Sequence, residues 1–259
     1  MSYVLSFSGG LDSTSLLLNL ICKNKPVYAI SFDYGQKHKI EIEFAKKNIK
    51  LLKTHGLNVN HKIVNISSIV CLLESSLTDP NINIPNGHYM DSNMKSTFVP
   101  NRNAIFSSVI YGYAISIYKK TLKNSSICLG VHSGDHLIYP DCRPEFYKSI
   151  IKSFHLGNWD SEHIDTYLPY INFSKSEIIK DGINSCKHLD LDFNLIYRNT
   201  LTTYSPDKSG RSDGMTGSDV ERILSFNEIG LEDPGLYNKK WSKLLEYALN
   251  CEKEIISKN

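Results

Sequence analysis

Residues 3–14 read YVLSFSGGLDST, an apolar run that passes directly into a polar turn. The run Tyr3 to Phe7 predicts a buried strand, and apolar residues at helical spacing from Ser13 to Cys22 predict the helix that follows. The glycines between them let the backbone approach an anion, and their N–H groups can form a nest at the positive end of that helix. The segment therefore predicts a phosphate-binding turn. Its expected ligands are Ser8, Gly9, Gly10, Asp12, Ser13 and Thr14.

Asp12 would repel a phosphate directly, so we expect it to orient the turn or to meet a bound Mg²⁺. The turn is not the GxxxxGK[ST] loop of nucleotide hydrolases, because it contains no lysine. A simple glycine-containing strand-to-helix turn remains the alternative.

Strand and helix patterns continue to alternate as far as residue 184. Further strands are expected at 27–32, 61–66, 127–131 and 164–168, and further helices at 40–55, 103–118, 143–154 and 174–184. Residues 67–98 are polar and irregular and are interpreted as a lid-like excursion. This alternation predicts an α/β fold in which a parallel sheet of five or more strands carries helices on both faces.

The pattern changes near residue 190. Residues 200–219 are rich in Thr, Ser, Gly and Asp, and helical stretches follow near 218–228 and 239–256. We therefore expect an ATP-binding α/β domain at 1–189 and a small helical extension at 190–259.

Composition excludes several classes of protein. The net charge is +2, from 29 basic and 27 acidic residues, which does not favour nucleic-acid binding. The six cysteines form no CxxC pair, which is typical of a reduced protein. No apolar run is long enough to span a membrane, and the first residues lack a signal-peptide pattern. A cytoplasmic enzyme is expected.

Five more motifs follow predicted strands or open predicted helices: FDYGQKH at 32–38, VPNRN at 99–103, GVHSGDH at 130–136, YPDCRPEF at 139–146 and SKSEI at 174–178. Each alone fits an ordinary turn or helix start. Together they belong at the carboxyl edge of a parallel sheet, where the ligand crevice of such sheets lies.

These motifs carry a resemblance. SGGLDST resembles the pyrophosphate-binding loop of the N-type (PP-loop) ATP pyrophosphatases. The whole set, in this order, resembles the 7-cyano-7-deazaguanine synthases, the QueC family, from residue 3 to about residue 230. That family adenylates the carboxylate of 7-carboxy-7-deazaguanine with ATP, forms an amide with ammonia, and uses a second ATP to dehydrate the amide to a nitrile.

The resemblance implies roles for particular residues. Asp12, Lys175 and Arg102 would act in catalysis, and ATP with Mg²⁺ on its phosphates would occupy the turn at 8–14. The deazaguanine side would be lined by Asp135, His136, Tyr139, Asp141 and Arg143. A homodimer is expected.

One segment departs from the family. Its members carry four zinc-binding cysteines near the C-terminus, and the matching positions here are Thr203, Asp213, Thr216 and Asp219. Thr is a poor zinc ligand, and two carboxylates do not make a sulfur-rich structural site, so no zinc is expected.

This departure leaves the acceptor open. QueC-like proteins also occur in bacterial antiphage operons, including CBASS-type systems, where a deazaguanine is joined to a protein amine. The favoured hypothesis is a ligase that forms such an amide in antiphage defence, with a partner such as a CD-NTase-like nucleotidyltransferase. The alternatives are an ordinary nitrile-forming synthase that uses ammonia and two ATP, and a non-catalytic module that holds nucleotide or deazaguanine.

Overall fold

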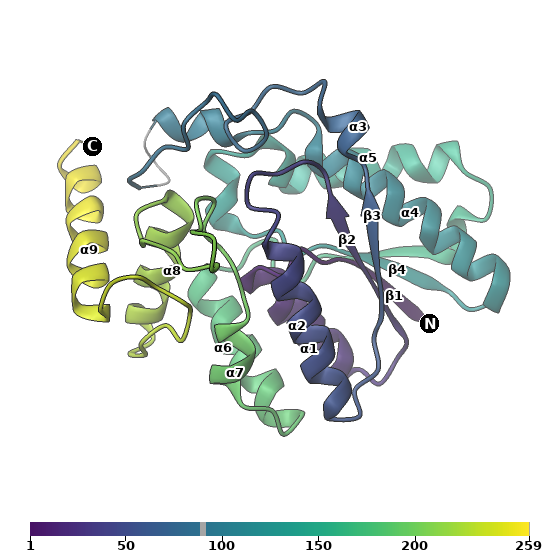
Figure 1. Cartoon of the computed structure of the whole chain (residues 1–259). Helices are drawn as coiled ribbons and strands as arrows, with labels where there is room; N and C mark the ends of the chain where they lie inside the picture. Colours follow the sequence, from purple (N-terminus) through teal and green to yellow (C-terminus); the bar gives the residue numbers. More distant parts are fainter. Residues whose placement is uncertain (89–91, 259) are drawn as a thin grey trace.

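A five-stranded parallel sheet forms the centre of the molecule in the computed structural model, which describes residues 1–88 and 92–258 (Figure 1). The strand order is β3-β2-β1-β4-β5. The strands are β1 (Ser2–Ser6), β2 (Val27–Asp33), β3 (Asn60–Asn65), β4 (Ser125–Cys128) and β5 (Ile164–Tyr167). The predicted sheet is thereby confirmed.

The first strand lies in the middle of this sheet. Leu5 pairs with Ala29 of β2 on one side and with Cys128 of β4 on the other. The chain builds outward from β1 to β3 and then returns to start again at β4, so the strand order reverses between β1 and β4. A crevice for ligands opens at such a reversal, beyond the carboxyl ends of the strands.

Helices cover both faces of the sheet because successive side chains of a strand point to opposite sides. Tyr3 and Leu5 pack among residues of one group of helices, whereas Val4 packs among residues of another. The first group is α1 (Leu11–Cys22), α2 (Glu41–Thr54), α6 (Lys175–His188) and α7 (Phe193–Arg198). The second is α4 (Arg102–Thr121), α5 (Pro144–Gly157) and the single turn α3 (Ser67–Val70).

The last two helices form a small layer of their own. Val220 and Ile223 of α8 (Gly217–Glu228) pack against Leu244 and Ala248 of α9 (Trp241–Lys258). Helix α8 also contacts α6, while α9 lies on the far side of α8 from the sheet (Figure 1). None of the helices in the described part of the chain is long and apolar enough to cross a membrane.

Several element boundaries differ from the sequence prediction. The fourth strand was expected at 127–131, but β4 ends at Cys128, opposite Tyr167 of β5. Leu129 and Val131 are buried without pairing, and hydrophobicity alone does not show where a partner strand stops. The stretch 67–98 contains α3 and the 3₁₀ helix η1 (Ser92–Thr97), and the short helix α7 was not expected at all.

Candidate active site

The loop after β1 forms a backbone cradle. Gly9 has φ +85°, and a Cβ there would lie 2.9 Å from Ala45, so only glycine fits. Gly10 follows as the N-cap of α1, and the Ser8 hydroxyl accepts a hydrogen bond from the Gly10 N–H at 3.1 Å. The first N–H groups of a helix have no partner within the helix, so those of α1 are available to an anion. This geometry could accommodate a phosphate, as the sequence predicts.

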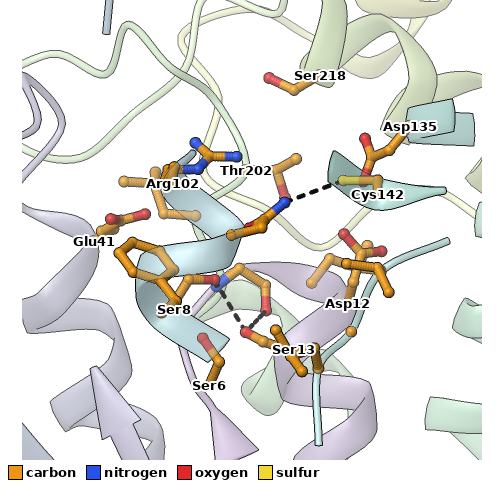
Figure 2. A pocket seen from close by; sticks show the side chains of 18 of the residues that line it. Ser6, Ser8, Asp12, Ser13, Glu41, Arg102, Asp135, Cys142, Thr202 and Ser218 are labelled. Carbon is orange, nitrogen blue, oxygen red and sulfur yellow. Dashed lines mark hydrogen bonds between the residues drawn. The ribbon is translucent and has the colours of Figure 1, made fainter. Parts of the chain in front are cut away.

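A cleft opens beside this loop, at the reversal of strand order between β1 and β4. It is lined by polar and aromatic side chains and is partly open to solvent, which suits a small-molecule site. Figure 2 shows Ser8 and Ser13 in its floor, Glu41 and Arg102 on one side, and Asp12, Asp135 and Cys142 on the other. The cleft therefore has two ends of different chemistry.

The acidic end surrounds one buried cation. The Lys175 ammonium lies 2.6 Å from a carboxylate oxygen of Glu221 and 3.5 Å from one of Asp12. Burial alone would lower the pKa of Lys175, but the carboxylates of Asp12, Glu221 and Asp135 outweigh it and raise that pKa above its ordinary value. Lys175 is therefore a permanent positive charge at the cleft.

A fully buried histidine adjoins these carboxylates. The His132 Nδ1 accepts the Gly134 N–H at 3.1 Å, so the ring proton is on Nε2 when the ring is neutral. That Nε2 lies 3.4 Å from Asp135 and 3.8 Å from Asp12. Burial raises the pKa of Asp135, while His132 and Lys175 oppose the rise. One carboxylate of the group is thus easier to protonate than an ordinary aspartate.

Asp12 can also meet a metal ion. Its Oδ1 is buried and has no hydrogen-bond partner among the described residues. Mg²⁺ prefers oxygen ligands and usually binds through one or two carboxylates together with substrate phosphates. Asp12 at the start of α1 fits that role.

The other end of the cleft holds Glu41 at the start of α2. Gln36 donates a hydrogen bond to Glu41 Oε1 at 2.8 Å, and His38 Nε2 lies 3.6 Å from Oε2. Burial raises the pKa of Glu41 to about 7, although Gln36 and Arg102 act against it. Burial, with Arg102 nearby, lowers the pKa of His38 to about 3, so that ring is neutral. Sequence reasoning assigned no role to these side chains, although FDYGQKH follows β2.

Seven of the sequence-predicted site residues line the cleft. They are Ser8, Gly10, Asp12, Ser13, Arg102, Asp135 and Lys175. Gly9 shapes the loop from behind, and Thr14 is buried below it. These positions come from four separate parts of the chain, which the sheet edge brings together.

Four residues expected on the deazaguanine side lie outside the described lining of the cleft. Asp141 accepts the backbone N–H of Asn103 at 3.1 Å and so caps the start of α4. Arg143 is exposed and donates to the His136 carbonyl at 2.8 Å. The Tyr139 hydroxyl bonds to that of Thr97 at 2.7 Å. Within the segment 132–145, Asp135 and Cys142 line the cleft, whereas the residues named above bond to neighbouring parts of the chain.

The tail supplies one wall of the cleft. Leu201, Thr202, Tyr204 and Ser218 line the cleft, and the Leu201 N–H donates to the Gly9 carbonyl at 3.2 Å. The hydroxyls of Thr200 and Thr202 accept hydrogen bonds from the buried Arg222 guanidinium, at 2.8 and 2.9 Å. Arg222 pairs in turn with Asp233. A network of side chains therefore holds residues 200–204 against the phosphate loop.

Three of the four positions that the resemblance matches to zinc cysteines meet in this wall. The buried Asp219 carboxylate accepts hydrogen bonds from Thr203 at 2.8 Å and from Thr216 at 2.5 Å on one oxygen, and from Ser212 at 2.7 Å on the other. Asp213 instead accepts the Met215 N–H at 3.0 Å. We call Thr203, Ser212, Thr216 and Asp219 the Asp219 cluster.

The Asp219 cluster does not fit zinc. Its hydroxyls and carboxylate bond to one another, and it offers no sulfur ligand. Over the described ranges 1–88 and 92–258, no group of three or more His, Cys, Asp or Glu side chains is placed to hold a metal ion.

Comparison with known proteins places these features in a family. The sequence model of the QueC family, described as queuosine biosynthesis protein QueC, matches residues 2–230. The 7-cyano-7-deazaguanine synthase 2 of Colwellia psychrerythraea is 42% identical over 236 residues, covering 91% of this chain and 98% of that protein. The 7-cyano-7-deazaguanine synthase of Caldicellulosiruptor saccharolyticus is 42% identical over 235 residues, covering 90% and 94%.

Among solved structures, the NMN synthetase of Francisella tularensis aligns with a TM-score of 0.41 and 17% identity, over 97% of this chain and 84% of that one. The family match covers the phosphate loop, the cleft and the tail wall alike. The chain therefore belongs to the QueC family.

Proposed function

We propose that this protein uses ATP to adenylate the carboxylate of 7-carboxy-7-deazaguanine and then transfers the acyl group to a nitrogen acceptor. The observation that carries the proposal is the cleft itself. A phosphate cradle at Ser8–Ser13 opens into the same cavity as the cations Lys175 and Arg102. Membership of the QueC family supports the choice of substrate.

The first step joins two anions. A carboxylate oxygen of the substrate attacks the α-phosphorus of ATP, the bond to the bridging oxygen of the β-phosphate breaks, and pyrophosphate leaves. Lys175, Arg102 and the first turn of α1 can neutralise the charge that builds up. Asp12 would hold Mg²⁺, which supplies further neutralisation of the phosphates when bound. The product is an acyl adenylate.

Ammonia is the acceptor that the comparisons favour, because the relatives are named as 7-cyano-7-deazaguanine synthases. The nitrogen attacks the acyl carbon, AMP leaves, and a proton is released to give the amide. The amide oxygen then attacks the α-phosphorus of a second ATP, and pyrophosphate leaves. Loss of AMP and of the remaining nitrogen-bound protons gives the nitrile.

A second candidate is transfer of the acyl group to a protein amine, for example on a CD-NTase-like nucleotidyltransferase. The tail wall favours it, because the Asp219 cluster stands where the family's zinc cysteines are expected. Glu221 and Asp135 are carboxylates at or beside the cleft that could receive an ammonium terminus. One ATP would then be used for each amide, and no nitrile would form.

Product analysis tests both candidates. The purified chain is incubated with ATP, Mg²⁺, 7-carboxy-7-deazaguanine and either ¹⁵N-ammonium or a candidate acceptor protein. We expect pyrophosphate release that depends on the base, and with ammonium a labelled nitrile formed with two AMP per product. A protein carrying the added acyl mass with one AMP would favour the second candidate. Binding of ATP and base without any AMP would refute the enzyme and leave a binding module.

A further inference from the structure

We infer that Glu41 and Arg102 recognise the two polar edges of the substrate base and make the enzyme specific for a guanine-like ring. The inference rests on the proposed function and adds the residues that bind the edges of the base. Both side chains line the same end of the cleft, opposite Asp12 and Asp135 (Figure 2). The segment 132–145 was the sequence-based expectation for this role.

Glu41 is held from behind and offers its carboxylate to the cleft. Only 8% of the residue is exposed. Gln36 donates to Glu41 Oε1 at 2.8 Å, and Gln36 is itself fixed by the Tyr34 N–H at 2.9 Å. His38 stands 3.6 Å from Oε2, beyond hydrogen-bond distance. The carboxylate therefore keeps acceptor capacity while its position is set by neighbours.

A guanine-like ring has the matching donors. Its ring N1–H and its 2-amino group lie side by side on one edge and point in nearly the same direction. A carboxylate accepts two such hydrogen bonds together, and bonds to a charged acceptor are stronger than neutral ones. These two hydrogen bonds would also stabilise the buried negative charge of Glu41.

Arg102 offers the complementary group. Its guanidinium interacts with the Tyr34 side chain and lies 5.9 Å from the centre of the Tyr139 ring, and the described residues place no carboxylate at ion-pair distance from it. On 7-carboxy-7-deazaguanine the ring carbonyl and the carboxylate project from one edge. That pair suits a guanidinium fork in the way that arginine contacts O6 and N7 of guanine in DNA.

The surrounding side chains are aromatic. Tyr34, Phe106 and Tyr204 line the same cleft, and Phe106 is stacked on Phe32 with ring centres 4.2 Å apart. Aromatic rings suit a flat heterocycle. Adenine is a poorer match here, because its amino donor lies beside a ring-nitrogen acceptor and it has no oxygen for Arg102. The chemistry of this end thus favours the deazaguanine over the nucleotide base.

The decisive test combines a conservative variant with an altered substrate. Glu41→Gln keeps the size of the side chain and an acceptor for Gln36, but it removes one of the two acceptors and the charge. We expect KM for 7-carboxy-7-deazaguanine to rise about 10- to 100-fold, with KM for ATP changed by less than about threefold. Glu43→Gln, on the exposed face of the same helix, is the matched control and should change neither KM.

The second arm uses 7-carboxy-7-deazahypoxanthine, which lacks the 2-amino group. The unaltered enzyme should disfavour it by about tenfold or more in kcat/KM, and Glu41→Gln should reduce that preference to about threefold or less. Arg102→Lys should raise KM for both bases, because a lysine cannot make the fork.

Two results would overturn the inference. One is a rise in KM for ATP equal to that for the base in Glu41→Gln. The other is an equal kcat/KM for the two bases in the unaltered enzyme. That result does not depend on whether any variant folds. Base-dependent pyrophosphate release by the unaltered enzyme separates these results from a failure of the proposed function.

Discussion

The ammonium nitrogen of Lys175 lies 2.6 Å from a carboxylate oxygen of Glu221, and this pair joins the start of α6 to α8. Both side chains are largely buried, at 3% and 19% exposure. Breaking a buried pair by removing one partner leaves an uncompensated charge and is strongly destabilising. The pair therefore links the cation that we propose to act in catalysis to the tail, so stability and activity have to be measured separately.

Lys175→Met should lower kcat/KM for pyrophosphate release by about 10²- to 10³-fold, because one cation is lost where charge develops in the transition state. The variant should also melt at a lower temperature, since Glu221 and Asp12 lose their partner. Adding Glu221→Gln should restore part of the stability without restoring activity. Lys180→Met, on the exposed side of α6, serves as the control. If kcat/KM of Lys175→Met stays within tenfold of that of the unaltered enzyme, Lys175 has no catalytic role.

The affinity for the base should rise with pH. Burial raises the pKa of Glu41 to about 7 in the free protein, and N–H donors bind the ionised form. Glu41 is mostly protonated at pH 6 and mostly ionised at pH 8, so KM for the base should fall about tenfold over that range. Glu41→Gln should flatten the profile. A profile that the variant leaves unchanged would assign the titration to another group.

The raised pKa of Glu41 also affects stability, which should fall as the pH rises, whereas the affinity for the base should increase. The folded-state pKa of Glu41 lies above its unfolded value of about 4.3, so the protonated form is the one that folding favours. Its contribution to stability is present below pH 4.3 and is lost as the pH rises through 7. Relative to Glu41→Gln, the unaltered protein should thus lose stability between pH 4.5 and pH 7, as measured by chemical unfolding.

The Asp219 cluster should stabilise the tail without a metal. Asp219→Asn replaces an acceptor with a donor inside a set of three hydroxyls, which should cost about 1–3 kcal/mol and lower Tm by several degrees. Asp213→Asn keeps the acceptor used by Met215 and should change Tm by less than about one degree. A large loss of Tm on treatment with EDTA or phenanthroline would mean that a metal holds the tail instead.

Two glycine substitutions should act in opposite directions. Gly9→Ala places a Cβ 2.9 Å from Ala45 in a backbone with φ +85°, so it should distort the phosphate loop and sharply weaken ATP binding. Gly112→Ala lies in α4, where an added Cβ meets nothing within 4 Å. It should stabilise the protein by about 0.4–1 kcal/mol with unchanged activity. Calorimetry with ATP and thermal melting of both variants measure the contrast. Normal ATP affinity in Gly9→Ala would show that the loop tolerates a side chain.

The sheet and most helices followed from the sequence because hydrophobic periodicity is a local property. The approximate site followed for a related reason, since Asp12, Asp135 and Lys175 come just after strands or at helix starts. Glu41 was not assigned because a glutamate at a helix start is ordinary in itself. Asp141, in contrast, was assigned to the site but lies outside the described lining of the cleft. Its carboxylate caps α4 through Asn103, and no local pattern distinguishes a helix-capping aspartate from one that faces a ligand.

The hydrogen bond from Leu201 to Gly9 joins segments separated by most of the chain. During synthesis the loop at residues 8–14 leaves the ribosome well before the cleft wall at residues 201–218. Nucleotide therefore cannot assist folding of the emerging sheet through the complete site. The nascent α/β layers would have to reach their arrangement unliganded, and ATP would add its stabilisation only once the residues up to Ser218 have been synthesised.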